Sequence, residues 1–96
     1  MKIVNIIPEY EAMIGKKVSP VIAQFAEQMD TIGKWIEDQG LEDAAQGLPV
    51  PSNDVFRSWS EKTVVADAAV QQTVADLLRL YYMDGYEQRE KLEVPA

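Results

Sequence analysis

Apolar residues recur every three or four positions through the centre of the chain, which is the repeat of an amphipathic helix. Between positions 19 and 39 most of the intervening residues are charged or polar and fall on the other side of that helix, among them Gln24, Glu27, Asp30, Lys34 and Asp38. The apolar positions are Ile22, Phe25, Ala26, Met29, Ile32, Gly33 and Ile36. Ser19 suits the N-cap, Pro20 the first helical position and Gly40 the end. The sequence therefore predicts a helix over 19–39.

The segment 59–90 is apolar on nearly every side when it is projected as a helix at about 100° per residue. Ser58 and Glu61 have the spacing of a capping box, which predicts the start of this helix, and Gly85 is expected to end or bend it. A helix that is apolar all round is buried on more than one face. Its second face is therefore expected to lie against the rest of the domain, against a second copy in a homodimer, or against a different protein. One side gathers Val70, Val74, Leu77, Leu78, Tyr81 and Tyr82, and the opposite side gathers Val65, Ala69, Leu80 and Met83.

The N-terminal segment, 1–18, predicts two short elements. Residues 2–7 are mostly apolar and could form a short strand, although no partner strand is evident. Pro8 suits the first turn of a short helix over 9–14, which Gly15 would end.

The segment 41–58 is expected to hold short helices around a proline-rich connection, with Ser52 as a cap. Together with Trp59 it resembles a helix-turn-helix, because a short helix and a glycine precede a capped helix that ends in an aromatic residue. The resemblance implies a DNA-binding protein in which Ser52, Asn53 and Arg57 face DNA. The turn is longer than the usual three or four residues, and few positive charges lie nearby to contact phosphates.

These elements define the expected fold class, which is mostly all-α. A chain of 96 residues has the length of one domain. We expect a compact small helical bundle of two main helices plus one or two short helices, with or without a short N-terminal strand. Its expected parts within 1–96 are 1–18, 19–39, 41–58 and 59–90.

Cysteine and histidine are both absent from the sequence, which leaves carboxylates as the candidates for catalysis. Four of them cluster around Gly40, and they lack the alternating oxygen ligands of a calcium loop. The serines have no imidazole to activate them, and no glycine-rich phosphate loop occurs. We therefore expect no enzymatic activity, no cofactor and no metal ion.

The location of the protein is expected to be cytoplasmic. No apolar run reaches the roughly 20 residues that a membrane-spanning helix needs. The absence of cysteine also fits a reducing compartment.

The chain is acidic, since sixteen Asp and Glu face nine Lys and Arg, for a formal net charge of −7. This charge disfavours nonspecific binding to nucleic acid. It serves solubility, or it complements a basic partner. We therefore predict a non-catalytic protein-binding protein, an inhibitor or adaptor that covers a partner's basic surface. A homodimeric structural or assembly factor and the helix-turn-helix protein are the alternatives.

Trp35 departs from the pattern of its helix, because it falls among polar residues on the side where water is expected. Either another segment covers it, or it anchors a partner, since tryptophan is enriched at interface hot spots. Small phage-borne inhibitors of host defence systems share this size, this acidity and this lack of catalytic residues, which is a likeness of composition. The predicted partner-binding residues are Trp35, Glu37, Asp38, Glu42, Asp43, Leu80, Tyr82, Met83 and Tyr86.

Overall fold

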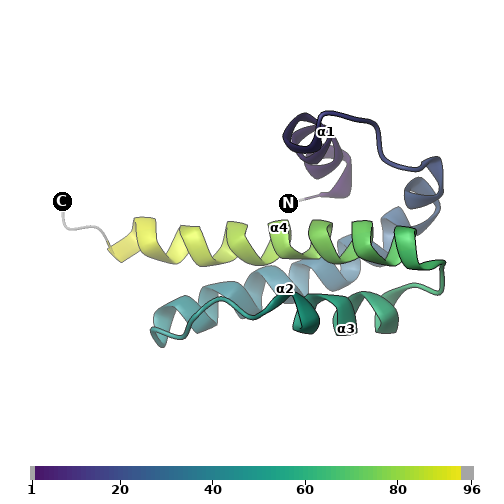
Figure 1. The fold of residues 1–96 in the computed structure, drawn as a ribbon. Helices are drawn as coiled ribbons and strands as arrows, with labels where there is room; N and C mark the ends of the chain where they lie inside the picture. The colour runs from purple at the N-terminus through teal and green to yellow at the C-terminus, as the bar shows by residue number, and fades with distance from the viewer. Residues whose placement is uncertain (1, 94–96) are drawn as a thin grey trace.

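The computed structural model describes the backbone of residues 2–93 and the side chains of residues 2–88. Within this part of the chain every regular element is helical, which confirms the predicted all-α class. The elements are α1 (Ile3–Ile14), the 3₁₀ helix η1 (Pro20–Phe25), α2 (Ala26–Ala45), α3 (Asn53–Thr63) and α4 (Ala68–Glu93) (Figure 1).

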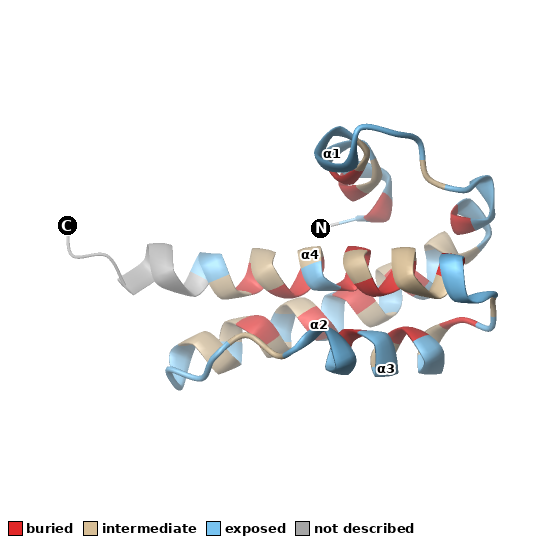
Figure 2. Ribbon diagram, viewed as in Figure 1, coloured by how far each residue is buried: buried red, intermediate tan, exposed pale blue. Residues whose placement is uncertain are grey.

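Helix α4 is the centre of the fold, because α1, η1, α2 and α3 all contact it. Helices α2 and α4 run in the same direction, and α3 runs back beside them (Figure 1). Buried residues line α4 where it faces its neighbours (Figure 2). Of the residues predicted for its second face, Leu80 and Met83 are partly buried against the core of the domain, whereas Val65, which precedes the helix, and Ala69 are exposed. The exposed side chains among its described residues are small or polar: Ala68, Ala69, Arg79, Glu87 and Gln88.

The contact between α2 and α4 is a close approach of two helix backbones. A Cβ atom at Gly40 would overlap the carbonyl oxygen of Tyr82, and one at Gly85 would overlap the carbonyl oxygen of Glu37. The prediction that Gly40 ends the first main helix was wrong, because α2 continues to Ala45. Gly85 does not end α4 either. Both glycines serve close packing between helices, which outweighs their low helix propensity of about 1 kcal/mol relative to alanine.

The prediction of a strand over 2–7 was wrong, because α1 already begins at Ile3. Ile3, Ile6 and Tyr10 follow helical spacing and are buried in the core. The carboxylate of Asp30 accepts a hydrogen bond from the Ile3 amide at 2.7 Å and so satisfies one of the free amides at the start of the helix. Burial of a helical stripe thus overrides the strand-like composition.

The end of α1 and the start of the next helix follow the sequence. Gly15 ends α1 in the left-handed conformation, with φ of 73°. Ser19 caps the following helix by accepting a hydrogen bond from the Val21 amide at 3.3 Å. However, residues 20–25 form the 3₁₀ helix η1, and regular α-helix begins only at Ala26.

The predicted start of the C-terminal helix at 59 was also wrong, because Ser58 and Glu61 lie inside α3. The chain leaves α3 at Val64, whose side chain is buried, and α4 begins at Ala68. Asp67 supplies the cap, since its carboxylate accepts from the Val70 amide at 2.9 Å. A buried apolar residue between two helices therefore replaces the predicted capping box.

The α3–α4 connection is fixed by the side-chain amide of Gln71. Its nitrogen donates to the carbonyl oxygen of Val64 at 2.6 Å, and its oxygen accepts from the buried hydroxyl of Ser60 at 2.9 Å. Ser52 occupies the N-cap position of α3 without a side-chain cap bond. Residues 41–45, predicted as a separate short helix, are the last turn of α2.

Three tyrosines join helices to one another by donating hydrogen bonds to carboxylates. Tyr10 on α1 reaches Asp76 on α4 at 2.7 Å. The other two lie on α4 and reach α2, from Tyr81 to Asp30 at 3.0 Å and from Tyr82 to Asp43 at 2.6 Å. Three of the sixteen acidic side chains therefore accept a hydrogen bond from a tyrosine of another helix.

These pairs make stability sensitive to alkaline pH. Burial, and then the hydrogen bond to Asp76, raise the pKa of Tyr10 to about 12. Burial likewise raises the pKa values of Tyr81 and Tyr82, followed by their hydrogen bonds to Asp30 and Asp43. Because the folded pKa values exceed the unfolded value of about 10, this stabilisation is complete below pH 10 and is lost as pH rises through the folded values. Above pH 10 we expect the tyrosinate absorbance at 295 nm to rise over the same pH range in which the helical circular dichroism signal falls. Ionisation of all tyrosines near pH 10 in a helical protein would contradict the pairs.

Candidate functional site

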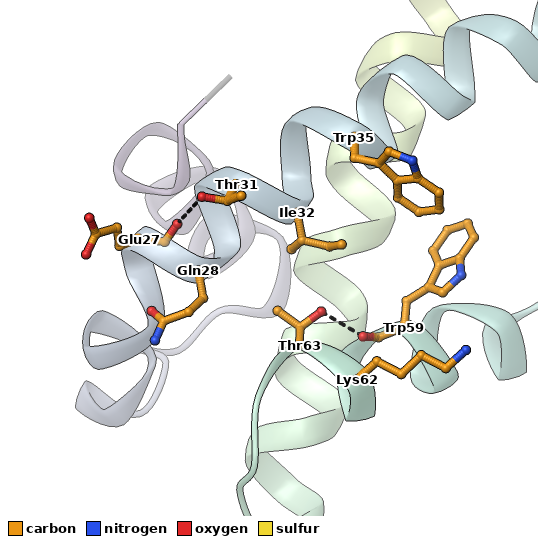
Figure 3. Close-up of a pocket in the computed structure, with 8 residues that line it drawn as sticks. All are labelled: Glu27, Gln28, Thr31, Ile32, Trp35, Trp59, Lys62 and Thr63. Carbon is orange, nitrogen blue, oxygen red and sulfur yellow. Dashed lines mark hydrogen bonds between the residues drawn. The ribbon is translucent and has the colours of Figure 1, made fainter.

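An open groove runs between α2 and α3, with a volume of about 840 Å³. The helix α2 forms one wall and the C-terminal half of α3 forms the other (Figure 3). Its lining residues are Glu27, Gln28, Thr31, Ile32, Trp35, Trp59, Lys62 and Thr63.

The two tryptophans lie at one end of this groove, with Ile32 and Thr63 further along it (Figure 3). The rings of Trp35 and Trp59 meet edge to face, with centroids 5.6 Å apart and an interplanar angle of 79°. Trp59 also packs on the buried ring of Phe56 at 5.4 Å, which in turn packs on Tyr82 at 5.6 Å. Trp59 is thus held by the core, whereas 49% of Trp35 remains exposed.

The prediction for Trp35 offered a covering segment or an exposed anchor, and the structure shows a part of each. Trp59 covers one edge of the ring, and about half of the residue faces solvent. Large aromatic side chains that are held in place yet exposed suit binding, because little conformational freedom is lost when a partner covers them.

Both hydroxyl groups that line the groove are satisfied within their own helices. The Thr31 hydroxyl donates to the carbonyl oxygen of Glu27 at 3.1 Å, and the Thr63 hydroxyl donates to that of Trp59 at 2.7 Å. Two charged groups remain on the walls, the carboxylate of Glu27 and the ammonium group of Lys62, and both residues are exposed. The groove therefore offers apolar area with one charge of each sign, which suits binding.

Two of the predicted acidic residues lie on the same exposed side of α2 as Trp35. Asp38 follows it by three residues and Glu42 by seven, which places them one and two turns further along. Glu42 also accepts a hydrogen bond from Gln46 at 3.3 Å. The structure thus brings these three predicted residues onto one face.

Glu37 lies elsewhere, on the side of α2 that approaches the C-terminal half of α4. It is partly buried, and burial together with a hydrogen bond to the carboxyl group of Asp84 raises the pKa of Glu37. The side-chain amide of Gln88 donates to both carboxyl groups, at 3.1 Å to Glu37 and 3.0 Å to Asp84. This carboxyl pair therefore contributes to the contact between α2 and α4.

The other predicted residues also contribute to the interior. Tyr82 is fully buried, and its hydroxyl donates to Asp43. Leu80 and Met83 are partly buried against the core. The Tyr86 hydroxyl donates to the carbonyl oxygen of Leu48 at 2.8 Å and holds the α2–α3 connection on α4. The four of these residues that lie on α4 belong to a helix with no large apolar side chain exposed among its described residues.

Sequence reasoning missed the α3 wall, which consists of Trp59, Lys62 and Thr63. Trp59 was expected as the beginning of the long helix and, under the helix-turn-helix alternative, as the aromatic end of the capped helix. A signal was available, since Phe56 and Trp59 are three residues apart on one helical face. That this face meets Trp35 depends on the turn between α2 and α3.

The residues of the DNA-binding alternative mostly face α4. Asn53 accepts a hydrogen bond from Arg79 at 2.9 Å, and Arg57 donates to Gln72. Ser52 is exposed at the start of α3. The alternative stays a prediction, although two of its three residues have partners within the fold.

Comparisons with known proteins add no assignment: no protein-family model, curated protein or solved structure matches the chain. Among the described residues, no group of three or more acidic side chains is arranged to hold a metal ion. No described helix is both long and apolar enough to cross a membrane. The site is thus defined by its own geometry, as an aromatic groove on a small helical domain.

Proposed function

We propose that this protein acts without catalysis by binding another protein and covering a basic surface on it, as an inhibitor or adaptor. The observation that supports this most directly is Trp35, half exposed at the end of an apolar groove and held against Trp59. Tryptophan is among the residues that contribute most to binding energy at protein interfaces.

Electrostatics indicate the character of the partner. The chain has a net charge of −7, and Asp38 and Glu42 are exposed on the same side of α2 as Trp35. Such an arrangement accelerates encounter with a basic surface and repels acidic ones. Proteins that process nucleic acids carry basic surfaces, so blocking such a machine, as a phage-type anti-defence inhibitor does, is one role of this kind.

The proposal is tested with a tagged wild-type protein and the double variant Asp38→Lys/Glu42→Lys. Capture from the source-cell lysate, with and without nuclease, identifies candidate partners by mass spectrometry. Binding of the purified partner is then measured at several salt concentrations. We expect a direct complex whose association rate falls with salt and is about tenfold lower for the double variant.

Two results would contradict this proposal. One is a partner whose association rate is independent of both salt and the double variant. The other is recovery that disappears with nuclease, accompanied by retention of duplex DNA that Arg57→Ala abolishes. That second result would favour the helix-turn-helix alternative.

A further inference from the structure

We propose that the groove between α2 and α3 receives one face of an amphipathic, basic α-helix of the partner. Its apolar side chains would cover Ile32 and the rings of Trp35 and Trp59. Its Lys or Arg side chains would pair with acidic groups on α2. This inference rests on the proposed function and specifies the structural element that the site binds.

The walls of the groove favour a helix over a strand. Both walls are α-helices, so they present side chains and no free backbone edge to which a strand could hydrogen-bond. The α2 wall extends from Glu27 to Trp35, which is roughly 12 Å at 1.5 Å per residue. Two turns of a partner helix match this length and place apolar residues at i, i+3, i+4 and i+7 against it.

The side chains that line the groove favour contact with apolar side chains of the partner helix. The hydroxyls of Thr31 and Thr63 already donate to carbonyl oxygens of their own helices. They therefore need no polar partner, and the contact gains mainly from covering the partly buried Ile32 and the two indole rings. The half-exposed ring of Trp35 also offers its aromatic system to a cationic side chain, which is attracted to the face of such a ring.

The exposed charges along α2 indicate where the partner's cations lie. Glu27 lines the groove two turns before Trp35, and Asp38 and Glu42 follow Trp35 by one and two turns. A helix lying along α2 therefore meets carboxylates on both sides of its apolar centre. Lys62 lines the groove and the exposed Lys34 precedes Trp35 on α2, and these cations favour a polar or acidic residue of the partner at their positions.

A second copy of this chain is a poorer occupant of the groove. Each copy carries a net charge of −7, so the two would repel one another as they approach. The charge complements a basic helix instead.

The groove contains its own reporter, because Trp35 and Trp59 are the two tryptophans of the chain and both line it. The probe is a lysine–leucine peptide with leucines at helical spacing. Three controls accompany it: a glutamate–leucine peptide of the same spacing, a lysine–leucine peptide with strictly alternating leucines, and a proline-rich peptide. We expect a saturable change of tryptophan emission with the helical lysine–leucine peptide and at least about tenfold weaker binding of the controls.

Matched variants locate the binding. Glu27→Lys and Glu9→Lys change the net charge equally, and both residues are exposed, but only Glu27 lines the groove. We expect Glu27→Lys to weaken peptide binding about tenfold and Glu9→Lys to have little effect. Trp35→Ala, followed through Trp59 emission and checked for helicity, should weaken it by a similar factor. Lys62→Glu should strengthen it, a gain that misfolding cannot produce.

The inference is overturned if the glutamate–leucine or proline-rich peptide binds as well as the helical lysine–leucine peptide. Equal effects of Glu27→Lys and Glu9→Lys, or unchanged affinity in a folded Trp35→Ala variant, would overturn it too. If the natural partner binds in a salt-dependent way but ignores Trp35→Ala, the groove inference fails while the proposed function stands. If the peptide binds as expected but no protein partner is captured, the preference of the groove for a basic helix stands while the proposed function fails.

Discussion

Gly85→Ala is expected to destabilise the folded protein by about 3 kcal/mol or more, at the upper end of the range for overpacked sites. A methyl group at this position would overlap the carbonyl oxygen of Glu37. That oxygen belongs to the backbone of α2, so relief requires α2 and α4 to separate along the most extensive contact in the fold. The free energy of unfolding, measured by chemical denaturation and circular dichroism, tests this result.

The sign of the effect is informative, because helix propensity alone predicts that the same change stabilises α4 by about 1 kcal/mol. Gly40→Ala should behave like Gly85→Ala, since it would overlap the backbone of Tyr82. Gly15→Ala is the control, because its Cβ meets open space and only its positive φ opposes the change, at about 1 kcal/mol. A Gly85→Ala protein as stable as the wild type would show that the two helices are not in backbone contact.

Asp30→Ala is expected to destabilise the protein by roughly 3 kcal/mol, the sum of two lost interactions. One carboxylate oxygen of Asp30 accepts from the amide of Ile3 at 2.7 Å and from the hydroxyl of Tyr81 at 3.0 Å. It therefore joins α1 and α4 to α2. Its removal leaves the start of α1 uncapped and the hydroxyl of the buried Tyr81 without an acceptor.

Asp30→Asn is the matched variant, because it keeps an oxygen acceptor and removes the charge, and it should lose less stability than Asp30→Ala. A double-mutant cycle with Tyr81→Phe should give a coupling energy of about 1 kcal/mol. Hydrogen exchange should accelerate more in α1 than in α2, because α1 has few other contacts. If Asp30→Ala lowered the free energy of unfolding by less than about 0.5 kcal/mol, as at an ordinary surface position, the role of Asp30 in joining α1 and α4 to α2 would be contradicted.

The all-α class could be predicted because it follows from local periodicity. Apolar residues follow the helical repeat from Ile22 to Ile36, and they occupy nearly every side of the helix around Leu77 and Tyr81. Such residues must be buried on helical faces, whichever segment covers them. Gly15 and Ser19 were also predicted correctly, since a left-handed residue and a hydroxyl cap act within a few residues of themselves. These features depend on short-range geometry that a sequence states directly.

The predictions failed where a distant segment reverses a local signal. Gly40 has the local signature of a helix end, but the structure shows that it lies inside a helix where the backbone of Tyr82 leaves no room for a side chain. Residues 2–7 have the composition of a strand. In the fold, however, Asp30 accepts a hydrogen bond from the amide of Ile3, and Ile3 and Ile6 are buried in the core as part of a helix. Ser58 and Glu61 have capping-box spacing, yet the buried side chain of Val64 sets the break between helices.

The residues of the candidate site likewise comprise some that local sequence patterns identified and others that depend on contacts between distant segments. Trp35 was identifiable because it violates the polar pattern of its helix, whereas Trp59, from the other wall, was not. Tyr82 and Asp43 were expected to face a partner and instead bond to one another. By itself the sequence determined the all-α class, the charge and the place of Trp35 outside the apolar stripe of its helix, because composition and local periodicity fix these properties. The tertiary structure decided which acidic groups are acceptors in the fold and where the groove lies, because those depend on how α2, α3 and α4 meet.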